Sequence, residues 1–258
     1  MGILNVTPDS FYDGGQYEAI DTVVKRAEEM LVAGADILDI GGYSSKPNAT
    51  EVSLKEELNR VLPAIRAIVK AFPEAILSID TFRSEVAKQS IEAGAAIIND
   101  ISAGNLDPAM FDLVEKLNVP YIMMHMQGTP QTMQKSPAYE HVTKDIIREL
   151  SEKVYQLKTR GANDILIDPG FGFGKTIEQN YKLLRELELF SVFELPLLVG
   201  VSRKSMIYKV LDTQASEALN GTTALHMFAL ERGANILRVH DVKEAKEVIM
   251  LHDQLTLA

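Results

Sequence analysis

Short apolar runs alternate with amphipathic segments along the whole of this 258-residue chain. Each run has the length of a buried β-strand, and each is followed by apolar residues at the 3.6-residue spacing of a helix. The eight runs cover residues 2–4, 36–40, 75–79, 96–99, 120–124, 164–167, 196–201 and 235–239. Eight strands, each followed by a helix, predict an α/β protein.

The ends of the predicted helices support this alternation. A glycine follows the last helical turn at Gly34, Gly94, Gly161 and Gly233, each just before the next apolar run. A glycine at this position is typical of a helix that terminates in the left-handed backbone region. Ser53 and Ser84, which precede acidic residues, are expected at helix starts.

A (β/α)8 TIM barrel and a doubly wound open sheet both show this alternation. An open sheet gathers its ligand-binding groups at one or two switch points. In this chain polar residues follow almost every strand, and we therefore predict the barrel. No stretch rich in Pro, Gly or Ser divides the sequence. We expect residues 1–258 to form a single domain.

Composition excludes several functions. A net charge of -10 and a pI near 5.1 argue against nucleic-acid binding, which requires a clustered basic surface. The absence of cysteine excludes disulfides and thiolate metal sites, and it suits a cytoplasmic protein. We find neither a basic-then-apolar leader nor an apolar run of about 18 residues, so we expect neither secretion nor a membrane partner.

Residues that close the strands of a barrel converge on one face, even when they are far apart in sequence. Taken singly, Asp100 and Asp241 are explained as helix caps and His125 as a satisfied core histidine. Capping alone does not explain polar residues after nearly every strand, so we expect a binding site there. The strand-end residues are Asn5, Asp39, Asp80, Asn99, His125, Asp168, Ser202, Arg203, Lys204, Arg238 and His240.

Two of the connections between strands and helices are unusual. The polar stretch from Asn5 to Gly15 has about ten residues, whereas such loops usually have 2 to 6, and we expect it to have a function. The segment from Gly170 to Thr176 is similar to a phosphate-binding loop, but three residues, not four, separate its outer glycines. We interpret it as a flexible rim on which Phe173 packs against a substrate.

The strand-end residues fall into two chemical sets. The first set suits a flat heterocycle with an amino-amidine edge and a ring carbonyl, and it comprises Asp80, Asn99, Asp168 and Lys204. Arg238 and His240 alternate along the last strand and so point the same way. With Asn5 they suit an anion such as a phosphate with bound Mg²⁺, which requires oxygen ligands. We find no zinc pattern and no nucleophile elbow.

Seven motifs in this order resemble the dihydropteroate synthase family over essentially the whole chain. They lie at residues 5–15, 79–81, 98–101, 124–128, 168–175, 200–205 and 238–241, and the first begins Asn-Val-Thr-Pro-Asp-Ser-Phe. The resemblance implies a (β/α)8 barrel, a homodimer and an enzyme of folate biosynthesis that sulfonamides target. Its reaction joins 6-hydroxymethyl-7,8-dihydropterin pyrophosphate to p-aminobenzoate and gives 7,8-dihydropteroate and pyrophosphate. Such an enzyme transfers an alkyl group other than methyl.

The resemblance also implies roles for individual residues. The pterin would be held by Asp80, Asn99, Asp168 and Lys204, and Asn5 would ligate Mg²⁺. The pyrophosphate would lie on Arg238, Val239 and His240, with Ser45 nearby. The p-aminobenzoate site would comprise Ser45, Lys46, Pro47, Phe173 and Ser202, and Asp13 would stabilise a cationic centre. The implied catalytic set is therefore Asp13, Asp80, Lys204, Arg238 and His240.

The chain departs from the family pattern after the second strand. Where the family usually has Glu-Ser-Thr-Arg-Pro-Gly, residues 43–48 read Tyr-Ser-Ser-Lys-Pro-Asn. Lys46 keeps the charge of arginine but lacks its planar fork. Asn48 replaces a glycine, which adopts any backbone region. These changes bear on p-aminobenzoate and sulfonamide binding, and they leave the pterin set intact. The abrupt start of the chain leads us to expect a less completely covered barrel floor.

Three other functions compete with the synthase. A pterin-dependent methyltransferase barrel would share the acidic pterin groups, but the motif at residues 5–11 and the pair Arg238 and His240 argue against it. A homologue that binds pterin without turnover is compatible with Lys46 and Asn48. A phosphate-binding barrel of another pathway explains fewer of the motifs.

Overall fold

The computed structural model describes residues 1–6, 15–43, 52–129, 133 and 138–257. Eight strands occur among them, at or within two residues of the predicted bounds. They are β1 (Gly2–Asn5), β2 (Ile37–Gly41), β3 (Ile76–Asp80), β4 (Ile97–Asp100), β5 (Tyr121–Met124), β6 (Ile165–Asp168), β7 (Leu198–Val199) and β8 (Ile236–Leu237).

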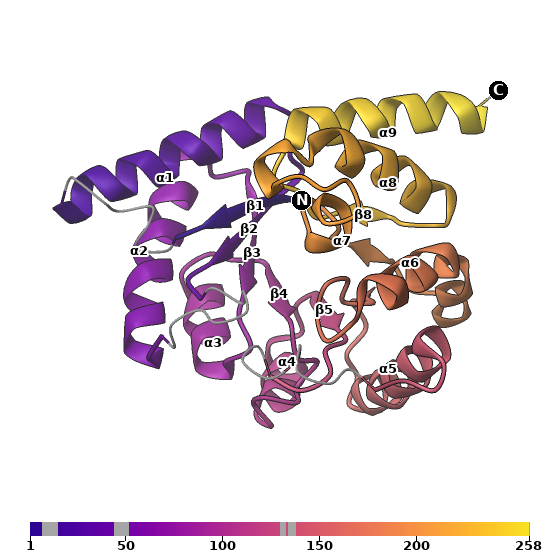
Figure 1. Cartoon of the computed structure of the whole chain (residues 1–258). Coiled ribbons are helices and arrows are strands. Elements are labelled where there is room, and N and C mark those ends of the chain that lie inside the picture. Colours follow the sequence, from indigo (N-terminus) through magenta and orange to yellow (C-terminus); the bar gives the residue numbers. More distant parts are fainter. Residues whose placement is uncertain (7–14, 44–51, 130–132, 134–137, 258) are drawn as a thin grey trace.

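The strands form a closed parallel barrel. Strands β1 to β6 pair in sequence order, and β7 pairs with β8. A parallel bridge between Ile167 and Leu197 joins β6 to the β7 strand, and a second bridge between Gly2 and Val239 joins the end of β8 to β1. The predicted (β/α)8 barrel is therefore confirmed, and the helices surround it (Figure 1).

Each strand is followed by helical structure. The α-helices are α1 (Gly15–Val32), α2 (Leu54–Ala71), α3 (Ser84–Glu92), α4 (Met110–Leu117), α5 (Val142–Thr159), α6 (Ile177–Arg185), α7 (Ser205–Tyr208), α8 (Leu219–Glu231) and α9 (Val242–Leu257). Two 3-10 helices, η2 (Leu187–Phe193) and η3 (Ala215–Glu217), extend the connections that follow α6 and α7. None of the helices in the described ranges is long and apolar enough to cross a bilayer.

The predicted helix termini are largely confirmed. Gly34, Gly94, Gly161 and Gly233 all have positive φ, between 89° and 116°. Ser53 caps α2 by accepting a hydrogen bond from the Glu56 N–H at 3.2 Å. The prediction for Ser84 was one residue off, because Arg83 occupies the cap position and Ser84 begins the helix. The Ser84 N–H is instead accepted by Asp107 from the next unit, at 2.7 Å.

Alternate residues of the strands pack on opposite sides of the barrel wall, in two of the three apolar clusters that the described residues form. Ile165 and Leu237 belong to the large core between the strands and the helices. Their strand neighbours Leu166 and Ile236 pack against a smaller cluster inside the barrel, formed by Met1, Ile97, Ile122 and Leu198. This division follows from the two-residue period of a strand. The smaller cluster fills the amino end of the barrel and leaves the carboxyl end for polar groups.

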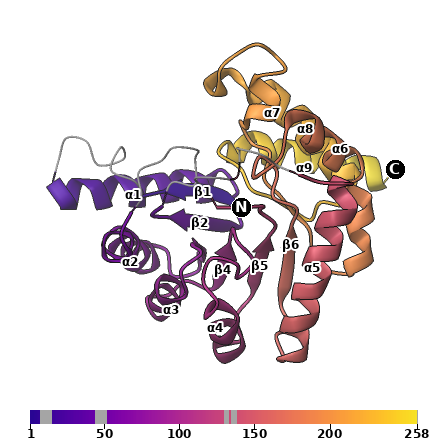
Figure 2. The ribbon, with the colours of Figure 1, turned by 60° about the horizontal axis from the view of Figure 1, so that its bottom comes forward.

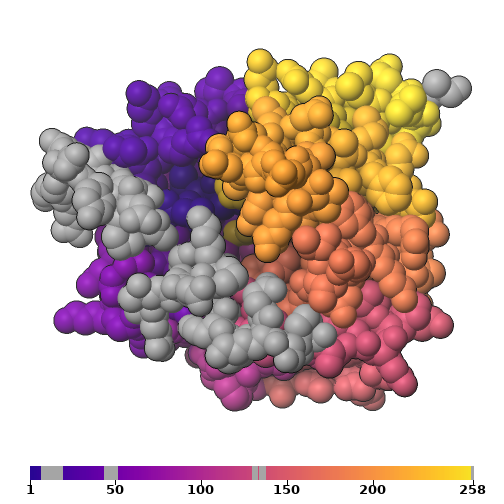
Figure 3. Space-filling view, viewed as in Figure 1, coloured from indigo at the N-terminus to yellow at the C-terminus, as the bar shows by residue number. Residues whose placement is uncertain are grey.

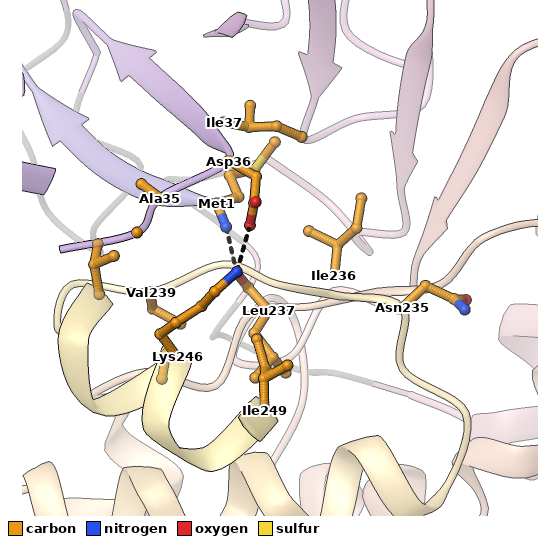
Figure 4. Close-up of a pocket in the computed structure, with 13 residues that line it drawn as sticks. Met1, Ala35, Asp36, Ile37, Asn235, Ile236, Leu237, Val239, Lys246 and Ile249 are labelled. Atoms are coloured by element: carbon orange, nitrogen blue, oxygen red, sulfur yellow. Dashed lines mark hydrogen bonds and ion pairs between the residues drawn. The ribbon is translucent and has the colours of Figure 1, made fainter. Parts of the chain in front are cut away.

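A cavity of about 260 Å³ lies at the amino ends of β2 and β8, beside α9 (Figure 4). There the Met1 amine donates to the Leu237 carbonyl at 3.0 Å, and Lys246 Nζ lies 3.6 Å from the Asp36 carboxylate. The remaining lining is mostly apolar. This cavity is at the opposite end of the barrel from the polar strand-end residues, so it is not part of their site.

Candidate active site at the carboxyl end of the barrel

Arg238 and two aspartates form the centre of the site. The Arg238 Nε donates to Asp39 Oδ2 at 2.6 Å, and its Nη2 donates to Asp80 Oδ2 at 2.6 Å. Asn99 Nδ2 donates to the same Asp39 oxygen at 2.9 Å. Strands β2, β3 and β4 and the end of β8 thus contribute one member each. Parallel pairing brings these strand ends together, as the barrel prediction requires.

Asp39 is a member of this network to which the sequence analysis gave no role. It is fully buried, and its Oδ1 has no hydrogen-bond partner among the described residues. Its single Oδ2 orients both Asn99 and Arg238. An aspartate between the apolar residues Leu38 and Ile40 was the available signal, because a buried carboxylate requires a charged or hydrogen-bonding partner.

Burial and charge oppose each other in this network. Burial raises the pKa of Asp80 to about 7; the Arg238 charge lowers it, and the Asp39 carboxylate raises it again. Burial alone would lower the pKa of Arg238, but Asp39 and Asp80 raise it above its ordinary value. Arg238 therefore stays charged while buried. We expect a ligand that brings negative charge to compete with Asp80 for it.

Asp168 and Lys204 stand beside this centre. Asp168 ends β6, is 5% exposed, and accepts the Gly170 N–H at 2.7 Å through Oδ1. No described residue donates to its other oxygen. Lys204 Nζ donates to the Phe171 carbonyl and lies 4.6 Å from the centroid of the Phe173 ring. Burial raises the pKa of Asp168 and lowers that of Lys204 to about 8.

Gly200 and Gly41 show how closely these groups approach one another. A Cβ on Gly200 would lie 3.8 Å from Lys204 Nζ and 3.9 Å from Arg238 Cβ. A Cβ on Gly41 would lie 3.5 Å from Asn5 Oδ1 and 3.6 Å from Asp80 Oδ2. The two chemical sets inferred from the sequence therefore meet in one site.

His240 is paired with Ser202 next to this centre. The Ser202 Oγ accepts the His240 backbone N–H at 3.2 Å and lies 3.0 Å from His240 Nδ1. With the Ser202 hydroxyl as the donor to Nδ1, the proton of the neutral ring lies on Nε2. Burial, followed by the Arg238 charge, lowers the pKa of His240 to about 4. His240 is therefore a neutral N–H donor near pH 7.

Arg203 joins the segments that carry Ser202 and His240. Its guanidinium makes a two-pronged contact with the Asp241 carboxylate, with N–O distances of 2.8 Å. It also donates to the carbonyls of Ala215 and Ser216 in η3. Figures 2 and 3 show this part of the chain, with α7 and η3 in orange, projecting from the carboxyl end of the barrel. The carboxylate of Asp241, predicted as a cap, is instead paired with Arg203.

The other sequence predictions have mixed outcomes. His125 is a buried, satisfied histidine, as predicted, and its ring nitrogens lie 3.2 Å from Glu149 and from Lys175. Asp100 accepts backbone N–H groups of its own turn, at Ser102 and Gly104, as expected of a capping residue. Strand β8 ends before Arg238, but the backbone remains extended to the Val239 bridge. The predicted residues Asp13, Ser45, Lys46 and Pro47 lie outside the described ranges.

The described part of the site holds no preformed metal cage, because no group of three or more His, Asp or Glu residues lies close enough together there. This donor set suits Mg²⁺ that is shared with a substrate, since Mg²⁺ keeps several waters and takes few protein ligands beside substrate phosphates. Asn5 ends β1 with its side chain exposed, and its Oδ1 and Asp80 Oδ2 would lie 3.5 Å and 3.6 Å from the same Cβ built on Gly41. Asn5 therefore fits the predicted role of a single oxygen ligand.

The fold and the site define a TIM-barrel enzyme whose pocket offers carboxylates, an amide and cations to one polar ligand. Residues 1–240 match the family model described as pterin binding enzyme. Dihydropteroate synthase of Escherichia coli K12 is 47% identical over 251 residues, which is 96% of this chain and 88% of that protein.

Solved structures agree with the sequence relatives. The Yersinia pestis dihydropteroate synthase, solved with a sulfonamide drug complex, is 44% identical with a TM-score of 0.93 and covers 100% of this chain and 94% of its own. The Xanthomonas albilineans enzyme with 4-aminobenzoic acid is 38% identical with a TM-score of 0.92 and covers 100% and 93%. The chain belongs to the dihydropteroate synthase family. The predicted family, fold class and enzyme class are thereby confirmed.

Proposed function

We propose that this chain condenses 6-hydroxymethyl-7,8-dihydropterin pyrophosphate with p-aminobenzoate to give 7,8-dihydropteroate and pyrophosphate in folate biosynthesis. The observation that carries the proposal is the cluster at the barrel mouth in which Arg238 pairs with Asp80 and, through Asp39, is linked to Asn99. Asp168 and Lys204 lie next to it. Such a cluster serves both halves of the substrate, because carboxylates accept heterocycle N–H groups while cations bind a diphosphate.

The pterin is held by the acidic half of the cluster. Asp168 offers the oxygen that Gly170 does not use, and Asp80 and Asn99 reach the ring from β3 and β4. Lys204 supplies the one cationic donor, for a ring carbonyl or nitrogen. Nearly complete burial of Asp168 and Asn99 makes mismatched ligands costly, since each unpaired buried group loses its solvation.

The pyrophosphate lies on Arg238 and His240, with Val239 between them in the same segment. Arg238 is pre-positioned by Asp39, and His240 presents its Nε2–H because Ser202 occupies its Nδ1. Asn5 would hold Mg²⁺ through its side-chain carbonyl oxygen. When bound, Mg²⁺ supplies positive charge that stabilises the departing pyrophosphate.

The chemistry follows from the leaving group. The bond between the pterin methylene carbon and the pyrophosphate oxygen breaks, and the electron-rich dihydropterin delocalises the positive charge. The neutral aniline nitrogen of p-aminobenzoate then attacks the methylene carbon and loses a proton. No covalent nucleophile is required, so the protein contributes positioning and electrostatic stabilisation. We assign to Asp13 the stabilisation of the cationic centre.

The second substrate binds beside Lys204. Phe173 and Ser202 border this position, and residues Ser45, Lys46 and Pro47 complete the p-aminobenzoate site in the proposal. The Xanthomonas albilineans relative was solved with 4-aminobenzoic acid and the Yersinia pestis relative with a sulfonamide drug, which supports a pocket for both in this chain. Lys46 in place of the usual arginine makes the carboxylate contact less directional.

We further propose that the enzyme is a cytoplasmic homodimer that binds neither nucleic acid nor membranes. A groove between α6 and α8 is lined by the apolar or aromatic side chains of Tyr181, Leu184, Leu225 and Phe228 and by the charged residues Glu178, Lys182 and Arg185. Phe228 is 38% exposed. The apolar and aromatic side chains provide a face that a second copy would cover. Sedimentation velocity of the wild type and of Phe228→Glu tests this; two monomeric samples would refute the dimer.

Product analysis tests the proposed reaction. The protein is incubated with both substrates and Mg²⁺, and 7,8-dihydropteroate is separated by chromatography and identified by mass. Asp168→Asn serves as the control for contaminating enzyme, because it alters one pocket oxygen. Product from the wild type that falls strongly in the variant is expected. Absence of product from a folded wild type that binds the pterin ester would instead favour the non-catalytic homologue.

A further inference from the structure

Lys175 is a buried amine inside the turn between β6 and α6, and no step of the proposed reaction uses it. Burial lowers its pKa to about 7, against the Asp168 charge, which raises it. Its side chain is 3% exposed. Its Nζ donates to the Gly170 carbonyl at 2.8 Å and to the Phe173 carbonyl at 3.0 Å, and it lies 3.2 Å from His125 Nδ1. The ammonium thus bridges two carbonyls of its own turn, and it does not point to the substrate as in a phosphate-binding loop.

A chain of polar contacts holds Lys175 in place. His125 Nε2 lies 3.2 Å from the Glu149 carboxylate on α5. When Lys175 is charged it only donates, and His125 then accepts through Nδ1 and donates its Nε2–H to Glu149. The hydrogen bond from His125 lowers the pKa of Glu149 despite its partial burial. The Glu149–His125–Lys175 chain therefore connects α5, the end of β5 and the β6–α6 turn.

The turn packs directly on the backbone that follows β5. Gly170 has a φ of 72°, and a Cβ there would lie 1.9 Å from the His125 carbonyl oxygen. A Cβ on Gly174 would lie 2.9 Å from the Gln127 carbonyl oxygen. Neither glycine has room for a side chain, so the turn lies closely against this backbone. We expected a flexible rim from the sequence; in the structure the Gly170 and Phe173 carbonyls of this turn are held by Lys175.

This turn carries three groups of the site. Its Phe171 carbonyl accepts Lys204 Nζ, its Phe173 ring lies 4.6 Å from that Nζ, and its Gly170 N–H donates to Asp168 at 2.7 Å. A shift of the turn would therefore move the cation and the aromatic ring that the proposed reaction places against its two substrates.

We propose that Lys175 is a positioning residue that acts through the Gly170 and Phe173 carbonyls to align Phe173 with p-aminobenzoate and Lys204 with the pterin. The Glu149–His125 pair keeps its ammonium directed at these carbonyls. The inference rests on the proposed function, because it assigns Lys175 to that same reaction.

The test measures kinetics and amide exchange on full-length Lys175→Met, which keeps the length and apolar stem of lysine. Misplacement of reacting groups by about 1 Å lowers rates by up to about a hundredfold, so we expect kcat to fall about tenfold or more and the KM for p-aminobenzoate to rise. Amides of residues 170–174 should exchange faster than in the wild type. A kcat and KM within about twofold of the wild type would overturn the proposal.

A double-mutant cycle separates positioning from general destabilisation. If Lys175 acts through Phe173, then Lys175→Met should raise the KM for p-aminobenzoate much less in a Phe173→Ala background, because coupled residues are not additive. If Lys175 had a purely structural role, the KM for p-aminobenzoate of the double variant would rise by the product of the increases seen in the two single variants. Equal losses in both backgrounds would refute the assignment.

Glu149 provides a second variant if Lys175→Met does not fold, since its side chain is 41% exposed. Glu149→Gln keeps an acceptor for His125, so its kcat and amide exchange should stay near those of the wild type. Glu149→Leu should have a lower kcat and faster amide exchange at residues 170–174. Equal kcat values and equal exchange rates in the Gln and Leu variants would contradict the role of the Glu149–His125–Lys175 chain. Wild-type turnover tests the proposed function separately, and amide exchange tests the hold on the turn even if turnover is absent.

Discussion

Asp168→Asn tests the pterin assignment without breaking the turn that Asp168 supports. The Gly170 N–H occupies Oδ1 at 2.7 Å, so an asparagine can keep that contact through its amide oxygen. Its NH₂ group then replaces Oδ2, the oxygen that we assign to the pterin. A donor would face the N–H donors of the heterocycle. Alanine would remove both contacts at once and would confuse the two effects.

The expected loss follows from one charge-assisted hydrogen bond. Such a bond contributes about 1.5–3 kcal/mol. At about 1.4 kcal/mol per tenfold, its loss weakens binding roughly 10- to 140-fold, and more if both pterin N–H groups use the same carboxylate. Burial raises the pKa of Asp168, which means that burying its charged form costs folding free energy. The variant should therefore be at least as stable as the wild type.

Isothermal titration calorimetry with the pterin pyrophosphate ester, without p-aminobenzoate, measures this affinity, and thermal unfolding checks the fold. Asp107→Asn is a matched control. Asp107 also accepts backbone N–H groups, from Ser84 at 2.7 Å and Ala109 at 3.0 Å, but it lies outside the site. The control should bind the ester like the wild type. An Asp168→Asn variant with an affinity within twofold of the wild type would refute the pterin assignment.

Three further predictions concern the anion, the second substrate and acid stability. Arg238→Ala should weaken binding of the pyrophosphate ester far more than that of free pterin in calorimetry, because only the ester carries the anion; equal losses would contradict its role. Lys46→Arg should lower the KM for p-aminobenzoate, since arginine restores a planar fork, and an unchanged KM would show that this position makes no contact. His226 is buried in α8 with neither ring nitrogen paired within the described ranges, and burial lowers its pKa to about 4. The unfolded state binds its proton more readily between pH 6.5 and 4, so stability falls as pH falls through this window. Between pH 7 and pH 5, the free energy of unfolding measured in urea should fall by ~2 kcal/mol more in the wild type than in His226→Leu. Equal falls in the two proteins would contradict this prediction.

Much of this architecture follows from local patterns. Apolar runs, 3.6-residue spacing and a glycine after each helix are properties of neighbouring residues, so strand positions and helix ends such as Gly34 could be predicted. Barrel closure then converts chain order into proximity, because parallel strands place their carboxyl ends on one face. Asp80, Asn99 and Arg238 were assigned to one site on this basis, and the structure brings them together.

The rest depends on side-chain directions between segments that are far apart in sequence. Asp39 pairs with Arg238 across 199 positions, and although its apolar neighbours indicate a buried carboxylate, no local pattern identifies its partner. The Lys175–His125 contact spans 50 positions. It directs the lysine into its own turn, whereas the comparison with a phosphate-binding loop suggests a lysine that points to the substrate. At the start of α3, the Ser84 N–H is accepted by Asp107, which lies 23 residues further along the chain, and not by a local cap residue.

The most direct test of the account is pyrophosphate release by the wild-type protein with the pterin ester and Mg²⁺, measured with and without p-aminobenzoate. We predict release that depends on p-aminobenzoate and equals the dihydropteroate formed, because the aniline nitrogen captures the methylene cation. Release at the same rate without p-aminobenzoate, or binding of the ester with no release at all, would contradict the proposed synthase reaction.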